Sequence, residues 1–215
     1  MTRLVLVRHG ESQVFVDGVV GGLLTCNGLS DLGRRQAIAL RDRLAATAEL
    51  DPVDVLVAST MPRAIETAEI MAPALGGLAV AQDEGLCERH PGEADGMSYD
   101  DARVAYGDEW DEDDPSLAFS PGGETWADFH ARVDTSLRRL AAEHEDRTIV
   151  VACHGGVVDV ALRALLDLPM VGGFEVHTQN TSLTEFVKVP ARERRTSRWR
   201  LVRYNDVAHL SGLIS

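Results

Sequence analysis

The sequence has no apolar run long enough to cross a membrane, and its first residues do not follow the pattern of a signal peptide. Its first apolar segment, residues 4–7, is short and Arg8 follows it at once. We therefore expect a cytoplasmic protein. The 215 residues, 45% hydrophobic and 26% charged, are enough for one globular domain with a sizeable core.

Positive charge is scarce. Lys and Arg together number 21 against 34 Asp and Glu, which gives a formal net charge of -13. Nucleic acids and anionic membranes need a basic face, so we expect neither as the main partner. Lys188 is the only lysine, and nearly every cation is therefore an arginine, which can bind phosphate through two hydrogen bonds. A small anionic substrate stays compatible with this charge, because it responds to the local field of a pocket.

Several catalytic signatures are missing. The three cysteines, Cys26, Cys87 and Cys153, form no CxxC pair and are expected to be reduced thiols. None of them has an arginine six positions later, which excludes the loop of cysteine phosphatases. There is no Gly-Lys-Ser/Thr of a P-loop, and the seven histidines show no HExxH spacing. We expect neither a metal nor a cofactor.

Short apolar runs at residues 4–7, 53–58 and 148–152 are typical of strands buried on both faces. Each run leads into a predicted helix: 31–46 after an N-cap at Ser30, one with Pro62 in its first turn, and 157–166. A further helix is predicted after Thr125, and a short strand at 78–80. This order predicts an α/β fold, a three-layer sandwich whose central sheet is mostly parallel with helices on both faces.

Two segments depart from this pattern. Residues 85–123 are rich in Gly, Pro and acidic residues, and we expect them to form a small cap inserted into a single domain, 1–215. The acidic run 108–114 fits a solvated surface, and alternatively faces a pocket and repels highly anionic substrates. Near the end, the strand-like segments 182–187 and 199–204 enclose an Arg-rich stretch within 192–203, which fits a polar hairpin turn or, alternatively, a basic docking patch.

Cationic side chains follow the three buried runs. Arg8 and His9 follow the first run, Arg63 the second, and His154 the third. The carboxyl ends of parallel strands lie on one edge of a sheet, so we expect these four side chains to converge. Two arginines, together with backbone N–H groups that Gly10, Gly155 and Gly156 would expose, describe a phosphate-sized anion site. Arg8-His9-Gly10 alone would fit the polar end of a strand equally well.

Seven segments carry a resemblance to a known family. They are LVLVRHGES, LSDLGRRQA, STMPRAIETA, LCERHPGEADG, GGETWADFHARV, VVACHGG and NDVAHL, in this order over nearly the whole chain. The sequence resembles the histidine phosphatase superfamily, which has the phosphoglycerate mutase-like fold. The resemblance implies that His9 is a nucleophile that forms a phosphohistidine, and that Glu88 is the general acid and base. Arg8, Arg63 and His154 would hold the phosphoryl oxygens.

Further substrate contacts follow from the same resemblance, and so do doubts about the substrate. Ser12 and Gly155 are candidate contacts, and Arg89 is a candidate for binding a substrate carboxylate, since Glu88-Arg89-His90 is similar to the true mutases. Phe15 stands where the family often has Asn, Cys26 where Asp is common, and Ala94-Asp95-Gly96 where Trp-Glu-Gly is frequent.

Simple chemistry agrees with these roles. Histidine attacks as the neutral base, and neighbouring arginines should lower its pKa from the usual value of about 6.5. A general acid must carry a proton, which nearby arginines oppose and a bound phosphate dianion favours. We therefore expect Glu88 to be protonated mainly when substrate is bound. Taken alone, Glu88 would fit a surface salt bridge with Arg89 equally well.

The sequence thus predicts a phosphatase that hydrolyses small phosphate monoesters in two steps through His9, acting on a small phosphorylated metabolite. One alternative is a cofactor-dependent phosphoglycerate mutase, although mutases of this family tend to be longer, with a C-terminal lid. Another is a non-catalytic protein that binds a phosphorylated ligand. A homodimer is left open.

Overall fold

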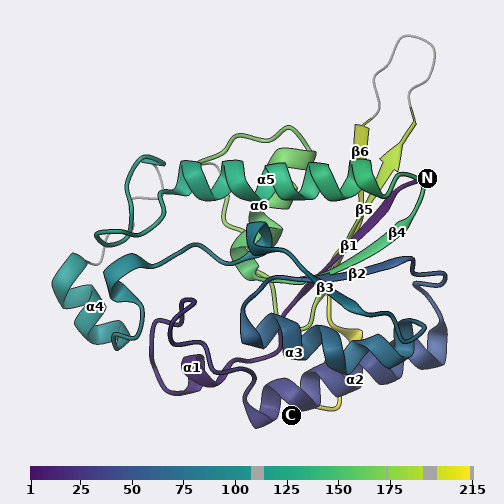
Figure 1. Cartoon of the computed structure of the whole chain (residues 1–215), viewed down its shortest axis with the longest axis horizontal. Coiled ribbons are helices and arrows are strands. Elements are labelled where there is room, and N and C mark those ends of the chain that lie inside the picture. Colours follow the sequence, from purple (N-terminus) through teal and green to yellow (C-terminus); the bar gives the residue numbers. More distant parts are fainter. Residues whose placement is uncertain (108–113, 173, 191–197, 214–215) are drawn as a thin grey trace.

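The computed structural model describes residues 1–107, 114–172, 174–190 and 198–213. Its centre is one six-stranded sheet in the order β3-β2-β4-β1-β5-β6 (Figure 1). The first four strands in that order pair in parallel, and β5 and β6 add an antiparallel edge. The strands are β1 Arg3–Arg8, β2 Val55–Ala58, β3 Val80–Gln82, β4 Thr148–Cys153, β5 Leu183–Val189 and β6 Arg198–Asp206.

Helices cover both faces of this sheet, which confirms the predicted three-layer α/β sandwich (Figure 1). Two helices, α2 Asp31–Thr47 and α3 Pro62–Met71, pack on one face. The other face is covered by α5 Trp126–Glu143 and α6 Gly155–Leu165. Successive side chains of a strand point to opposite faces. Accordingly, Leu4 and Leu6 pack on the α5 side and Val5 and Val7 on the α2 side.

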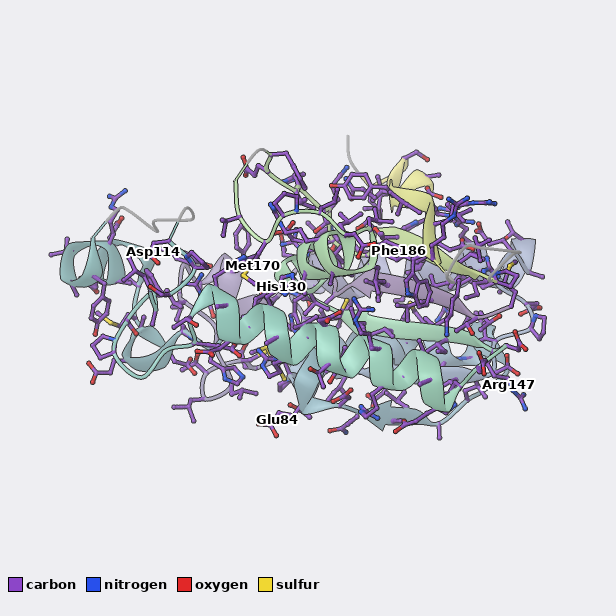
Figure 2. All side chains as sticks on the ribbon, turned by 90° about the horizontal axis from the view of Figure 1, so that it is seen from above. Glu84, Asp114, His130, Arg147, Met170 and Phe186 are labelled. Atoms are coloured by element: carbon purple, nitrogen blue, oxygen red, sulfur yellow. The ribbon has the colours of Figure 1, made fainter. Side chains whose placement is uncertain are left out.

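The parallel strands end at a common edge. Arg8 pairs in register with Cys153, and Ala58 with Ala152, so β1, β2 and β4 finish side by side. This edge faces the part of the molecule that carries α1 Gln13–Val16 and α4 Tyr99–Tyr106 (Figure 1). Figure 2 shows Asp114 and Met170 toward this end and Arg147, which precedes β4, at the opposite end. The loops that follow the strands therefore meet at one end of the sheet.

Local sequence signals explain most element boundaries. The Ser30 hydroxyl accepts a hydrogen bond from Gly33 N, and the Thr125 hydroxyl accepts one from Asp128 N, so both predicted N-caps are confirmed. Other boundaries were wrong by a few residues. The third strand begins at Val80 instead of Leu78, and the last long helix begins at Gly155 instead of Val157.

The helix containing Pro62, α3, begins without a side-chain cap and ends in a 3-10 helix. Its N-cap is Met61, which makes no side-chain cap, so the proline itself fixes the first turn. It passes into the 3-10 helix η1, Ala72–Leu75, which ends at Gly76 with a φ of 78°. Arg63 lies in the first turn, as predicted.

Between β3 and α5 the chain leaves the sheet. It forms the 3-10 helices η2 Glu84–Leu86 and η3 Gly92–Ala94 and then α4, beyond the carboxyl edge of the sheet (Figure 1). Of the predicted acidic run only Asp114 is described. The hairpin of β5 and β6 is confirmed, but its predicted Arg-rich turn lies largely outside the described residues. In the described ranges, no helix has the length and apolarity needed to span a membrane.

An ion-pair network fastens α2 to the antiparallel edge. The Arg43 guanidinium contacts Glu49 and Asp206 at 2.7 Å each, and Arg203 contacts Glu49 at 2.7 Å. The side chains of Arg43, Glu49, Arg203 and Asp206 are only 17–26% exposed, so water screens them incompletely. Hydrogen bonds from Arg43 lower the pKa of Asp206 to about 2. The network thus stabilises the fold when its carboxylates are ionised.

Replacing Asp206 with Asn should lower the free energy of unfolding at pH 7 by about 1 kcal/mol. The pKa of Asp206 is lower in the folded chain than the ~3.9 of an unfolded chain, so the contribution is complete above about pH 4 and is lost as the pH falls through 2. Urea denaturation of the wild type and D206N across this range measures the difference. Asp42→Asn, at an exposed ion pair, is the control. Equal stability of wild type and D206N at pH 7 would show that the network is not stabilising.

Candidate active site

His9 follows β1 directly and is 8% exposed. Its Nδ1 lies 2.6 Å from the carbonyl oxygen of Gly10. A carbonyl can only accept, so Nδ1 carries the proton and Nε2 has the lone pair. The Nε–H of Arg63 donates to this Nε2 over 3.2 Å, which requires the same tautomer. The fold thus presents His9 as a neutral imidazole with a defined basic nitrogen.

Burial lowers the pKa of His9 well below 6.5, and the charges of Arg63 and Arg8 lower it further. The predicted direction is right, but the predicted cause is incomplete, because removal from water is a larger influence than the arginines. Burial of this residue could not be derived from a strand-end motif. At neutral pH the imidazole is unprotonated and can act as a nucleophile.

Arg63 is fixed through its side chain and through its backbone. Its NH1 donates to the carbonyl of Gly21 over 3.0 Å, and its own carbonyl accepts a 2.7 Å hydrogen bond from the Thr67 hydroxyl. The same hydroxyl accepts from Gly10 N over 3.1 Å. Thr67, one turn along α3, therefore connects the arginine to the loop that contains His9.

Arg8 approaches His9 from the last position of β1. Its NH1 donates to the carbonyl of Thr178, and its Nε is buried with no hydrogen-bond partner in the described part of the chain. A buried guanidinium N–H without a partner is costly, and an anion would satisfy it. Arg8 and Arg63 thus place two arginine side chains around His9.

His154 is the N-cap of α6 and is fully buried. Its ring centroid lies 5.1 Å from that of His9, and its Nε2 lies 2.7 Å from the Ser59 hydroxyl. Its Nδ1 is buried with no partner among the described residues. Burial and the charge of Arg63 lower the pKa of His154 well below 6.5, so this ring too is neutral.

Glu88 is held by the backbone. One carboxylate oxygen accepts from Gly156 N at the start of α6 over 3.1 Å, and the other accepts from Arg89 N over 3.0 Å. A Cβ on residue 156 would lie 2.3 Å from the carboxylate and displace it, so the glycine leaves room for this contact. The glycines were expected to admit an anion to the backbone. Gly156 instead admits Glu88, and Gly10 admits the carbonyl of Gly33, 2.5 Å from where a Cβ would lie.

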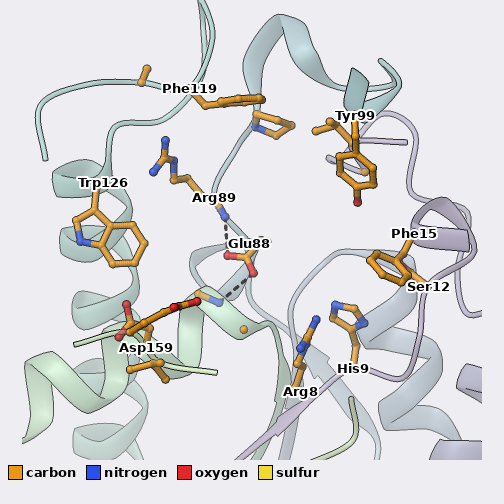
Figure 3. Close-up of a pocket in the computed structure, with 18 of the residues that line it drawn as sticks. Arg8, His9, Ser12, Phe15, Glu88, Arg89, Tyr99, Phe119, Trp126 and Asp159 are labelled. Atoms are coloured by element: carbon orange, nitrogen blue, oxygen red, sulfur yellow. Dashed lines mark hydrogen bonds between the residues drawn. The ribbon is translucent and has the colours of Figure 1, made fainter. Parts of the chain in front are cut away.

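These groups open into one cavity of about 870 Å³. Figure 3 shows Arg8 and His9 on one side of Glu88, and Arg89 extending away from them. The predicted site residues that line the cavity are Arg8, His9, Ser12, Arg63, Glu88, Arg89 and Gly155. His154 packs edge to face against His9 and is not itself part of the cavity lining. Within the described ranges, no cluster of His, Cys, Asp and Glu could hold a metal ion.

Asn180 is a residue of the site that was not predicted from the sequence. Its side-chain amide donates to the carbonyl of His9 over 2.9 Å, and it lines the cavity. Asn180 lies just before β5, whose antiparallel direction starts that strand at the edge where β1 ends. A polar residue before an antiparallel strand is therefore the signal that could have found it. Ser59 and Thr67 were also missed, because they act through His154 and Arg63.

The structure shows the surroundings of two positions, Phe15 and Asp95, at which the sequence departs from the family pattern. Phe15 lies on the short helix α1, lines the cavity and is 61% exposed. Asp95 accepts hydrogen bonds from Gly22 N, Leu24 N and the Thr25 hydroxyl. The Asp95 carboxylate therefore fixes the loop whose Gly21 carbonyl holds Arg63.

Comparison with known proteins is consistent with this geometry. The profile of the histidine phosphatase superfamily (branch 1) matches residues 4–207. Phosphoglycerate mutase-like protein 4 of Arabidopsis thaliana is 32% identical, over 96% of this chain and 86% of its own. Glucosyl-3-phosphoglycerate phosphatase of Mycobacterium tuberculosis is also 32% identical, over 97% and 96%. The structure of Bacillus stearothermophilus YhfR superposes with a TM-score of 0.82, at 28% identity, over 98% and 100% of the two chains.

Gly156→Ala should displace the Glu88 carboxylate, because the new Cβ would lie 2.3 Å from it. We expect at least a tenfold loss of kcat with an alkyl phosphate, within the range of general acid catalysis. The new Cβ would also lie 3.0 Å from the Phe129 ring, so urea denaturation of the variant is measured alongside to separate displacement of Glu88 from lost stability. Gly155→Ala is the matched comparison, since its Cβ finds its nearest atom at 3.4 Å and should cost less. Similar losses in both variants would argue against this role of Gly156.

The imidazole of His9 should stay unprotonated at Nε2 to well below pH 6.5, since burial and two arginines disfavour the cation. Nitrogen-15 NMR of histidine-labelled protein can follow this titration. Arg63→Met removes one of the causes and should raise the pKa of His9. A wild-type titration near 6.5, or no change in the variant, would contradict the electrostatic account.

Proposed function

Because the chain belongs to the histidine phosphatase superfamily and is a phosphomonoesterase, we propose that His9 carries the phosphoryl group between substrate and water. The observation that carries the proposal is the tautomer of His9, whose basic Nε2 lies beside Arg63 with Glu88 on the same cavity. A nucleophile, two cations and a carboxyl group on one cavity are the parts that phosphoryl transfer needs.

In the first step, Nε2 of His9 attacks phosphorus and a P–N bond forms. The ester P–O bond breaks, and the leaving oxygen takes the proton of Glu88. A bound phosphate dianion favours the proton on Glu88, so this group is prepared when substrate arrives. The backbone N–H groups of Arg89 and Gly156 keep its carboxyl group in place.

In the second step, the Glu88 carboxylate takes a proton from water, whose oxygen attacks phosphorus. The P–N bond breaks, inorganic phosphate leaves, and neutral His9 is restored. Throughout, Arg8, Arg63 and His154 hold the phosphoryl oxygens. The Ser59 hydroxyl accepts from Met61 N over 3.4 Å and can donate its own proton to His154 Nε2. The buried His154 Nδ1 then carries a proton for a phosphoryl oxygen.

We place the reaction in one domain, residues 1–215, with 85–123 as a cap over the site. Ser12 and Gly155 are further substrate contacts, and Arg89 would meet a carboxylate where a substrate carries one. We propose a cytoplasmic enzyme that acts on a small phosphorylated metabolite, with no nucleic acid or membrane as partner and no metal or cofactor. Whether it forms a homodimer can be measured by sedimentation.

Incubation with 3-phosphoglycerate and with p-nitrophenyl phosphate should release inorganic phosphate, with a phosphorylated His9 as intermediate. His9→Ala should abolish both the release of phosphate and the phosphorylated intermediate. Enzymatic assays measure how much inorganic phosphate is released from 3-phosphoglycerate and how much of the isomer 2-phosphoglycerate is formed. Isomer without phosphate would support the mutase alternative. No turnover and no phosphoenzyme with any ester would support a non-catalytic binding protein.

Glu88→Gln should slow the transfer of phosphate from an alkyl ester to His9 by about 10²–10⁴-fold. The loss should be much smaller for p-nitrophenyl phosphate, because its leaving group departs without a proton. Rapid-quench measurement of phosphoenzyme formation separates this step from its hydrolysis. Equal losses for the two esters, or a pH–rate profile that the substitution leaves unchanged, would remove Glu88 from the role of general acid.

A further inference from the structure

The cavity continues beyond the cationic groups, and there its walls are aromatic. The chain is poor in aromatic residues, at 5% of its length. Among the described residues, six aromatic side chains line this cavity: Phe15, Tyr99, Tyr106, Phe119, Trp126 and Phe174. Aliphatic side chains lie among them: Val14, Val20, Leu117, Met170, Val171 and Val176.

Several of these rings are unusually accessible. Phe15, Tyr99 and Phe174 are 61%, 48% and 45% exposed, whereas Phe129 and Phe186 are fully buried in the core. Leaving a large apolar side chain in water forgoes the stabilisation that its burial would give. Exposed apolar groups that gather in one concave site mark a binding surface. A ligand that covers these rings would recover that stabilisation.

The rings are arranged around the space beyond Glu88. Figure 3 shows Phe15 and Tyr99 on one side, and Phe119 and Trp126 on the other, with His9 and Arg8 at the end of the cavity. A phosphoryl group held at His9 would therefore direct the rest of its ester past Glu88 and between these walls. This is the space that a leaving alcohol occupies.

Two of the rings are held in place. The indole N–H of Trp126 donates to the carbonyl of Met170 over 3.0 Å, and its ring lies 5.4 Å from that of Phe129. Phe119 meets Tyr106 edge to face, with ring centroids 6.1 Å apart. These contacts order the wall before a ligand arrives, which lowers the entropic cost of binding.

The charges of this outer region do not favour a second anionic group. Arg163 pairs with Asp159 over 2.9 Å and lies 4.4 Å above the ring of Phe174, so its charge is already compensated. Hydrogen bonds from Ser116 lower the pKa of Asp114, which keeps this carboxylate ionised at neutral pH. Arg89 also lines this region, and 3-phosphoglycerate tests whether it recruits a carboxylate.

Building on the phosphatase activity proposed above, we propose that the preferred substrates are phosphate monoesters of bulky apolar alcohols, aromatic or long-chain. The apolar part would lie between the Phe15–Tyr99 wall and the Phe119–Trp126 wall. On hydrolysis the ester P–O bond breaks, the alcohol oxygen takes the proton of Glu88, and the apolar alcohol leaves through the open side of the cavity.

The test compares three primary-alcohol esters whose leaving groups have similar basicity: 3-phenylpropyl phosphate, propyl phosphate and 3-phosphoglycerate. We expect kcat/KM for the phenylpropyl ester to exceed that of each of the others at least tenfold, which is about 1.4 kcal/mol. Phe15→Ala should reduce kcat/KM for the phenylpropyl ester about fivefold and change that for propyl phosphate less than twofold. Tyr99→Ala, on a different segment, should act in the same selective way.

Val16→Ala is the matched control, because Val16 lies on the same short helix, is 56% exposed and is outside the cavity lining. This variant should leave kcat/KM unchanged for both the phenylpropyl and the propyl ester. Equal kcat/KM for the phenyl and propyl esters, or a preference for 3-phosphoglycerate, would overturn the inference while leaving the phosphatase intact. Uniform losses with both esters in F15A and Y99A would also overturn it. No hydrolysis of any ester would overturn the proposed function as well.

Discussion

The hydrogen bond between His9 Nδ1 and the carbonyl of Gly10 is the interaction on which the rest of the site depends. It decides which imidazole nitrogen is basic and points that nitrogen toward Arg63. Burial keeps the ring neutral, so a nucleophile exists at physiological pH without an adjacent general base. Without this bond the arginines would still bind an anion, but no defined lone pair would face it.

The sheet fixes the position at which this interaction forms. β1 is buried on both faces and pairs with β4 on one side and β5 on the other, so the position of its last residue is fixed. Arg8 and His9 leave the sheet at that point, His154 follows β4 beside them, and Asn180 precedes β5. Each of these groups then finds a partner from another strand end. Strand register thus places most of the site, and Glu88 comes from the segment after η2.

The sequence predicted the features that depend on local pattern. Strand β1, the caps at Ser30 and Thr125, and the common edge of Arg8, Arg63 and His154 all follow from apolar runs, capping residues and parallel topology. Features that depend on contacts between distant segments could not be predicted in this way. Gly156 making room for Glu88, Ser59 holding His154, and burial as the main cause of the low pKa of His9 require the packed structure. Asn180 is intermediate. Its position beside His9 follows from the pattern only once β5 is known to run antiparallel to β1.

The central claim is that Nε2 of His9 attacks phosphorus, and the position of the phosphoryl group on the imidazole tests it most directly. Rapid quenching during turnover of an alkyl phosphate, followed by NMR of the labelled phosphohistidine, distinguishes the two nitrogens. The account predicts a P–N bond at Nε2 of His9, with Nδ1 unmodified. A phosphoryl group on Nδ1 or on another residue, or turnover without any phosphoenzyme, would contradict it.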